Sequence, residues 1–224
     1  AANEDESTRL SYPFVVNATK VVSRADESNE RISLQGALQR ALAVEGACVT
    51  IRLEDDATGV SVTVPTGRRA VLDLRGRRLQ GVSNKPVITV ERGAALVIVD
   101  SVGDGTIMKD VVWTSDSGLC GGIVNFGELT LAGGSIADCA GLAFGGVSNA
   151  VGAVFTMTGG SIVNCRTFSS SAIAAPAVFN QGTFWMTGGE ISDCAAGRNV
   201  MAVYNDHDAV FRQMGGEIRD CSHG

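Results

Sequence analysis

The sequence lacks a basic domain, and lysine and arginine are scarce in its second half. It contains 18 Lys and Arg against 24 Asp and Glu, which gives a formal net charge of -6. Residues 1–110 hold 14 of these 18 cations, and the later ones are Arg166, Arg198, Arg212 and Arg219. Binding to a nucleic acid backbone requires clustered cations that release counterions, so we expect no nucleic acid partner.

Long apolar runs are also absent. No run approaches the roughly 20 residues that a helix needs to span a bilayer, so membrane insertion is not expected. The chain starts with Ala1-Ala2-Asn3 and no Met, as it would after removal of a signal peptide behind a small residue. We therefore expect a secreted or cell-surface protein, although a trimmed chain would begin in the same way.

A unit of the form Gly-Gly-x-Ile-x-Asx-Cys occurs four times in the second half. Successive glycine pairs lie 26, 29 and 27 residues apart, at Gly133-Gly134, Gly159-Gly160, Gly188-Gly189 and Gly215-Gly216. A period of this length is typical of a supersecondary unit that buries its apolar face only by stacking on its neighbours. Asp104-Gly105-Thr106-Ile107 resembles a degenerate earlier copy of the unit.

Each unit also contains alternating apolar stretches joined by an asparagine and a turn. Alternation with a period of two indicates strands, and Gly and Asn supply the left-handed backbone conformations of turns. We therefore predict an all-β fold, a right-handed parallel β-helix whose coils stack at about 4.8 Å. The predicted core columns are Leu129, Phe155, Phe184 and Phe211; Leu131, Met157 and Met186; and Ile136, Ile162, Ile191 and Ile218. In the last unit Gln213 replaces an apolar residue, which predicts a less buried coil.

The two ends of the chain differ from the repeats. Ser33 can cap an α-helix over about 33–46, which we expect to cover the first coil because the end of a solenoid needs a cap. The expected organisation is a polar segment over 1–32 and one β-helix domain over 33–224. Within that domain we expect irregular coils over about 47–110 and regular repeats over about 111–224. No capping sequence follows Cys221, so this end is expected to stack on more chain or on another protomer.

Two stretches carry a resemblance to a known group of proteins. Phe184-Trp-Met-Thr-Gly-Gly-Glu-Ile-Ser-Asp-Cys194 and Val64-Pro-Thr-Gly-Arg-Arg-Ala-Val-Leu-Asp-Leu-Arg-Gly-Arg-Arg-Leu79 resemble the repeats of bacterial surface proteins of the adhesin-like or pectate-lyase-like superfamily. The resemblance covers roughly residues 33–224 and implies a parallel β-helix. It is less specific for function, because the superfamily includes adhesins, polysaccharide lyases and glycoside hydrolases.

We therefore expect a structural or binding module of a bacterial surface protein that attaches to a host glycan or a host protein. The alternative is a carbohydrate-active enzyme, either a polysaccharide lyase or a glycoside hydrolase. An enzyme is less favoured, because the repeats hold no acidic cluster with a basic proton acceptor nearby. No cofactor is expected.

Exposed aromatic residues are the candidates for ligand binding. Trp185 lies in the outward phase of its strand beside Arg212, and Phe179 and Tyr204 occupy equivalent positions in adjacent coils. Aromatic faces flanked by polar groups suit stacking on sugar rings or anchoring a protein partner. The alternative is that the long segment from Arg166 to Pro176 covers the three aromatic side chains.

The weaker catalytic candidates are Asp206, His207 and Asp208, which fill a lengthened turn. Glycoside hydrolysis uses paired carboxylates, one as acid and one as base or nucleophile. Two carboxylates one residue apart in a turn are more simply explained as a polar insertion. An arginine cluster at Arg68, Arg69, Arg75, Arg77 and Arg78 could recognise an anionic glycan, but we expect solvated strand ends with acidic neighbours.

Two further columns follow from the repeat. Cys139, Cys165, Cys194 and Cys221 should lie one above another, and packed free thiols are favoured over disulfides such as Cys139–Cys165, which the spacing also permits. The preceding column is Asp138, Asn164, Asp193 and Asp220. It could hold Ca²⁺, but Asp and Asn commonly serve turns by accepting hydrogen bonds from backbone amides, so no metal site is expected.

Overall fold

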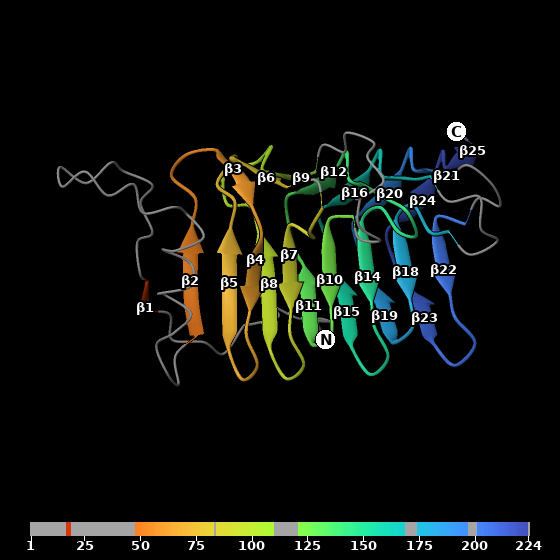
Figure 1. Cartoon of the computed structure of the whole chain (residues 1–224), viewed down its shortest axis with the longest axis horizontal. Helices are drawn as coiled ribbons and strands as arrows, with labels where there is room; N and C mark the ends of the chain where they lie inside the picture. Colours follow the sequence, from red (N-terminus) through yellow and green to blue (C-terminus); the bar gives the residue numbers. More distant parts are fainter. Residues whose placement is uncertain are drawn as a thin grey trace, which may run out of the picture.

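The computed structural model describes residues 17–18, 48–82, 84–109, 121–168, 174–196 and 201–223. The regular secondary structure in these residues consists of β-strands, which form four parallel sheets that we name A to D. Figure 1 shows the strands in rows along the longest axis, with the sequence advancing steadily from one end to the other. The predicted parallel β-solenoid is confirmed. No helix in the described ranges has the length and hydropathy that a membrane span requires.

Each turn of the solenoid passes from sheet A to sheet B and on to sheet C, and the later turns add a short strand of sheet D between B and C. Sheet A contains β1 (Asn17–Ala18), β2 (Cys48–Arg52), β5 (Arg69–Asp73), β8 (Ala95–Val99), β11 (Glu128–Leu131), β15 (Val154–Met157), β19 (Thr183–Met186) and β23 (Val210–Gln213). Sheet B contains β3 (Ala57–Val60), β6 (Arg78–Gly81), β9 (Thr106–Met108), β12 (Ser135–Ala137), β16 (Ser161–Val163), β20 (Glu190–Ser192) and β24 (Glu217–Arg219). Sheet C contains β4 (Val62–Val64), β7 (Ile88–Val90), β10 (Ile123–Asn125), β14 (Val147–Asn149), β18 (Val178–Asn180) and β22 (Val203–Asn205). Sheet D contains β13 (Ala140–Gly141), β17 (Arg166–Thr167), β21 (Ala195–Ala196) and β25 (Ser222–His223).

The strand registers place like residues above one another, as the repeat predicts. Phe155 pairs with Leu129 on one side and with Phe184 on the other, and Ile107 pairs with Ile136. The degenerate copy near residue 107 is therefore confirmed as a coil of the same solenoid. The rings of Phe155 and Phe184 stack with centroids 4.6 Å apart, and Phe184 stacks on Phe211 at 4.9 Å. These columns fill the interior that the alternation assigned to them.

The glycine pairs make the corner between sheets A and B. Gly160 and Gly189 have φ values of 68° and 83°, a left-handed conformation that glycine adopts without strain. A Cβ on Gly160 would lie 2.6 Å from the carbonyl oxygen of Gly134 in the preceding coil. The second glycine of each pair is therefore required both by its conformation and by the close approach of adjacent coils.

A ladder of asparagines runs through the interior at the C-terminal ends of the sheet C strands. Asn125, Asn149 and Asn180 are completely buried, and each side chain donates a hydrogen bond from Nδ2 to Oδ1 of the next asparagine, at 2.7–2.8 Å. The remaining Nδ2 hydrogens bond to strand carbonyls, for example from Asn149 to Thr183 at 3.0 Å. Asn205 in β22 is the exposed end of the ladder.

The last coil is less buried than those before it. Phe211 and Ile218 are only partly buried, and Gln213 is exposed, which confirms the prediction made from Gln213. The irregular coils over 47–110 belong to the same sheets, with a register shift between β3 and β6. The predicted helix over 33–46 and most of the polar segment over 1–32 lie outside the described residues.

Candidate functional site

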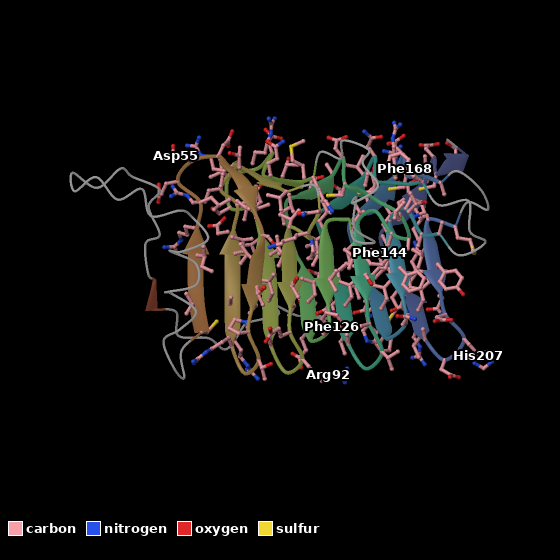
Figure 2. All side chains as sticks on the ribbon, in the orientation of Figure 1. Asp55, Arg92, Phe126, Phe144, Phe168 and His207 are labelled. Atoms are coloured by element: carbon pink, nitrogen blue, oxygen red, sulfur yellow. The ribbon has the colours of Figure 1, made fainter. Side chains whose placement is uncertain are left out.

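The row of turns that joins sheet C to sheet A brings together two of the candidate groups. These turns follow β4, β7, β10, β14, β18 and β22, and Figure 2 shows Arg92, Phe126 and His207 along the edge that they form. Tyr204 in β22 lies immediately before the turn that carries Asp206, His207 and Asp208. Phe179 and Tyr204 therefore lie beside the predicted catalytic turn, whereas Trp185 and Arg212 lie in β19 and β23 of sheet A.

The side chain of Asp206 is held in place by hydrogen bonds to both of its carboxylate oxygens. Its Oδ2 accepts a hydrogen bond from Gln181 Nε2 at 2.9 Å, and its Oδ1 accepts one from the backbone N–H of His207 at 2.8 Å. The bond from Gln181, then that from the His207 amide, lower the pKa of Asp206 below its usual value, and the Tyr204 side chain contributes in the same direction. Asp206 is therefore an ionised acceptor at neutral pH, fixed by neighbours from two coils.

His207 and Asp208 are in contact with each other but not enclosed. His207 Nδ1 lies 2.9 Å from Asp208 Oδ1, and the two side chains are 92% and 96% exposed. Together with Gln181, Gly182 and Asp206 they line an open depression of about 310 Å³. We name Gln181, Tyr204, Asp206 and His207, with this depression, the corner site.

The aromatic rings beside the corner site form a column along the outer side of sheet C. Phe179 stacks on Tyr204 with centroids 5.1 Å apart and an interplanar angle of 8°, and Phe144 lies 5.9 Å from Phe179 on its other side. Both faces of Phe179 are therefore occupied. Within the described ranges no ring stacks on the second face of Tyr204, which is half-buried.

Trp185 belongs to a separate column. The guanidinium of Arg212 lies 5.1 Å from the centre of the Trp185 ring, in a cation–π contact. The predicted set of four ligand-binding residues thus divides between two sheets. Sugar stacking on the covered face of Trp185 would require displacement of Arg212. Part of the segment from Arg166 to Pro176 lies outside the described residues, so the prediction that it covers these rings stays a prediction.

The arginine cluster does not form one patch. Arg69 is in β5 of sheet A and Arg78 in β6 of sheet B, while Arg75 lies in the corner between them. Arg75 Nη1 contacts Glu54 Oε1 at 2.7 Å, and Asp56 accepts a hydrogen bond from the backbone N–H of Arg78. This agrees with the expectation of strand ends that have acidic neighbours.

The Asx column has a conformational role. Asp138, Asn164, Asp193 and Asp220 all have φ values between 51° and 55°, in the left-handed region that Asp and Asn tolerate better than other side chains. Three or more metal-ligating side chains do not converge anywhere in the described ranges. We conclude that these residues turn the chain from sheet B toward sheet D.

This role predicts different stabilities for two truncations of Asp193. Asp193→Ala should lower the free energy of unfolding by about 1 kcal/mol, because the Cβ of alanine opposes a positive φ without the local polar interactions of Asp. Asp193→Gly removes the same side chain but accepts the conformation, so it should be at least as stable as the alanine variant. Urea unfolding of both proteins tests the prediction, which fails if alanine is the more stable of the two.

The cysteine column is confirmed as free thiols in the described residues. Cys139, Cys165 and Cys194 are completely buried, and Cys221 and Cys48 are partly exposed. The pKa of Cys165 lies well above its usual value, first because of its hydrogen bond with Cys139 and also because of burial. Burial likewise raises the pKa of Cys221. Cys120 lies outside the described residues.

The thiols are therefore expected to differ in reactivity. With iodoacetamide at pH 8, Cys48 and Cys221 should be alkylated in the native protein, while Cys139, Cys165 and Cys194 react only after unfolding, because the thiolate is the nucleophile. A higher pH should accelerate the reaction of the first pair, since their raised pKa values leave them largely protonated at neutral pH. Peptide mapping by mass spectrometry measures each site, and rapid native alkylation of Cys165 would contradict this assignment.

No protein-family model, curated protein or solved structure matches this chain. The corner site therefore has to be interpreted from its own chemistry.

Sequence patterns found Tyr204 and Asp206 but missed Gln181, whose position beside Asp206 depends on the register of two turns. The equivalent position of Gln181 and Asp206 after their asparagines was the available indication.

Proposed function

We propose that this chain is a non-catalytic binding module of a bacterial surface protein of the adhesin-like kind, and that it holds a glycan at the corner site. The supporting observation is an ionised carboxylate, Asp206, fixed by hydrogen bonds beside Tyr204, on whose second face no ring stacks within the described residues. The resemblance of the repeats supports the surface location, and the general preference of parallel crossovers supports a right-handed coil.

The chemistry of the corner site suits sugar hydroxyl groups. A carboxylate accepts several hydrogen bonds, and the two oxygens of Asp206 have lone pairs beyond those used by Gln181 and the His207 amide. His207 and Gln181 add donors and acceptors at the wall of the depression. The half-buried ring of Tyr204, which immediately precedes this turn, supplies an apolar surface for one side of a sugar ring.

The same features give no specific support to the enzyme alternative. A general acid needs a carboxyl group whose pKa is raised by an apolar environment, whereas the pKa of Asp206 is lowered. The other carboxyl group of the turn, Asp208, is almost fully solvated. Retention of a glycan without bond cleavage is therefore the function that the corner site supports best.

The test is affinity electrophoresis of the purified chain through gels containing neutral or acidic polysaccharides, with assay of reducing-sugar and unsaturated products. At least one polysaccharide should retard the protein without releasing product. Tyr204→Ala and Asp206→Asn should each weaken the retardation about five- to tenfold, the size expected for one lost contact of this kind. Asp138→Asn is the matched control, because it removes one exposed carboxylate from a position whose conformation Asn accepts.

Each outcome decides between the alternatives. Release of product would replace the binding module with a carbohydrate-active enzyme, and absence of retardation on every polysaccharide would overturn glycan binding. Loss of retardation in Trp185→Ala, with Tyr204→Ala unaffected, would overturn the corner site and place the glycan on sheet A.

A further inference from the structure

A second site lies on the outer face of sheet A, at the opposite end of the described solenoid from the corner site. An open groove of about 490 Å³ crosses β2, β5, β8 and β11. Its floor follows the outward column in which Thr50, Val71, Val97 and Thr130 are paired in register. The volume lies within the range of small-molecule sites. None of the candidate residues found from sequence patterns belongs to this groove apart from Arg69.

The middle of the groove's floor, formed by Val71 and Val97, is apolar although it faces outward. Val71 and Val97 stand where the later coils of the same column have Thr130 and Thr156. Ala95 and Val99 of β8 widen the apolar strip on both sides. Burial also raises the pKa of Cys48, against the opposing effect of Arg69, which is consistent with a poorly solvated edge. An apolar strip of this kind stabilises the hydrocarbon part of a ligand.

Thr50 provides an independent indication of a ligand. It lies in the outward phase of β2 but is only 5% exposed, and within the described part of the chain its Oγ1 has no hydrogen-bond partner. Buried hydroxyl groups in folded proteins are almost always hydrogen-bonded, because an unpaired one has lost water without replacement. Thr50 lines the groove, but its Oγ1 has almost no accessible surface, so a molecule bound there supplies the missing partner by displacing the atoms that cover this oxygen.

The charges at the borders of the groove balance. Arg69 and Glu128 stand on one side, and Arg52 and Asp73 on the other, with Arg52 Nε 3.9 Å from Asp73 Oδ2. Asp73 is further engaged by the backbone N–H and the hydroxyl of Ser101 at 3.0 and 2.9 Å. Two arginines and two carboxylates give no net preference for an anion or a cation, so the groove favours an uncharged molecule.

We propose that this groove binds a small neutral amphiphile, with its apolar body over Val71 and Val97 and its hydrogen-bonding group on Thr50 Oγ1. This site is separate from the corner site and takes a different class of ligand. Its ligand combines one polar group with an elongated or aromatic hydrocarbon, whereas the corner site offers several polar groups and one aromatic face.

The probe for the test is N-phenyl-1-naphthylamine, which is uncharged, has two aromatic parts and one N–H group, and fluoresces more strongly in apolar surroundings. Titration of the full chain should show saturable binding of one molecule per chain. Val97→Arg should abolish this binding by filling the floor. Thr156→Arg places the same side chain in the same outward column, outside the groove, and should leave the affinity unchanged.

The variant Thr50→Val distinguishes a contact of the Thr50 hydroxyl with the ligand from a role of this hydroxyl in stability alone. Valine has the same shape without the hydroxyl, so the affinity should fall about fivefold while the midpoint of urea unfolding stays the same or rises. Unchanged affinity in Thr50→Val would overturn the role of Thr50. Equal affinities of Val97→Arg and Thr156→Arg, or no saturable binding by the original chain, would overturn the site. Polysaccharide retardation should persist in Thr50→Val, so failure of this proposal and of glycan binding are distinguishable.

Discussion

Replacing Phe184 with alanine is expected to lower the free energy of unfolding by about 3–5 kcal/mol, the largest effect of any single change considered for this chain. Phe184 is completely buried, and its ring is stacked between those of Phe155 and Phe211. Alanine would remove the apolar burial and leave a void between two aromatic rings in adjacent coils. Rigid hydrogen bonds between the coils on either side limit how far the void can close.

Trp185→Ala is the matched control for this change. Trp185 is the next residue of β19 and is also aromatic, but it points outward and is only half-buried. Truncation of Trp185 should lower the free energy of unfolding by about 1 kcal/mol, mainly because the contact with Arg212 is lost. Urea unfolding followed by circular dichroism measures both variants. A loss in Trp185→Ala as large as that in Phe184→Ala would contradict the inward and outward assignment of β19.

Replacing Asn149 with alanine is expected to lower the free energy of unfolding by about 2–4 kcal/mol, because several buried polar groups would lose their partners at once. Asn125 Nδ2 would lose its bond to Asn149 Oδ1, and Asn180 Oδ1 would lose the bond donated by Asn149. The carbonyl of Thr183 would also lose a donor. These groups are less accessible to water than the exposed end of the ladder at Asn205.

Asn205→Ala is the corresponding control at that end. Asn205 is exposed, and the groups it leaves unpaired can hydrate, so the cost should be about 1 kcal/mol or less. Amide hydrogen exchange can localise the effect, since Asn149→Ala should increase exchange in β14 and its neighbours before the remote coils. Equal stabilities of the two alanine variants would show that the ladder contributes no more in the interior than at its end.

Much of the fold could be predicted because its repeat is visible in the sequence. The column Leu129, Phe155, Phe184 and Phe211 follows from alternation, and the corner glycines follow from the spacing of the pairs. Sheet D could not be predicted, because strands of two residues such as β13 and β17 are too short to show alternation. The asparagines were recognised as turn residues, but their complete burial was not predicted, because a polar residue beside a turn is normally solvated.

The candidate sites were less predictable for a related reason. Tyr204 belongs to the repeat and Asp206 follows it closely in sequence, whereas the contact between Gln181 and Asp206 depends on how consecutive turns align. Thr50 lies in a coil without the repeated motif, and nothing local distinguishes it from any other strand threonine. Its importance comes from the valines of β5 and β8, which the register alone places beside it.

The asparagine ladder also gives the rod a direction. Every amide dipole points the same way, with Nδ2 of one coil facing Oδ1 of the next. Deleting one whole coil, from one ladder asparagine to the next, would therefore still place an amide donor opposite an amide acceptor. The rod would become shorter by one coil spacing of about 4.8 Å. Inverting a coil would place donor against donor and acceptor against acceptor. The ladder therefore permits rods that differ by whole coils, but it requires every coil to have the same orientation.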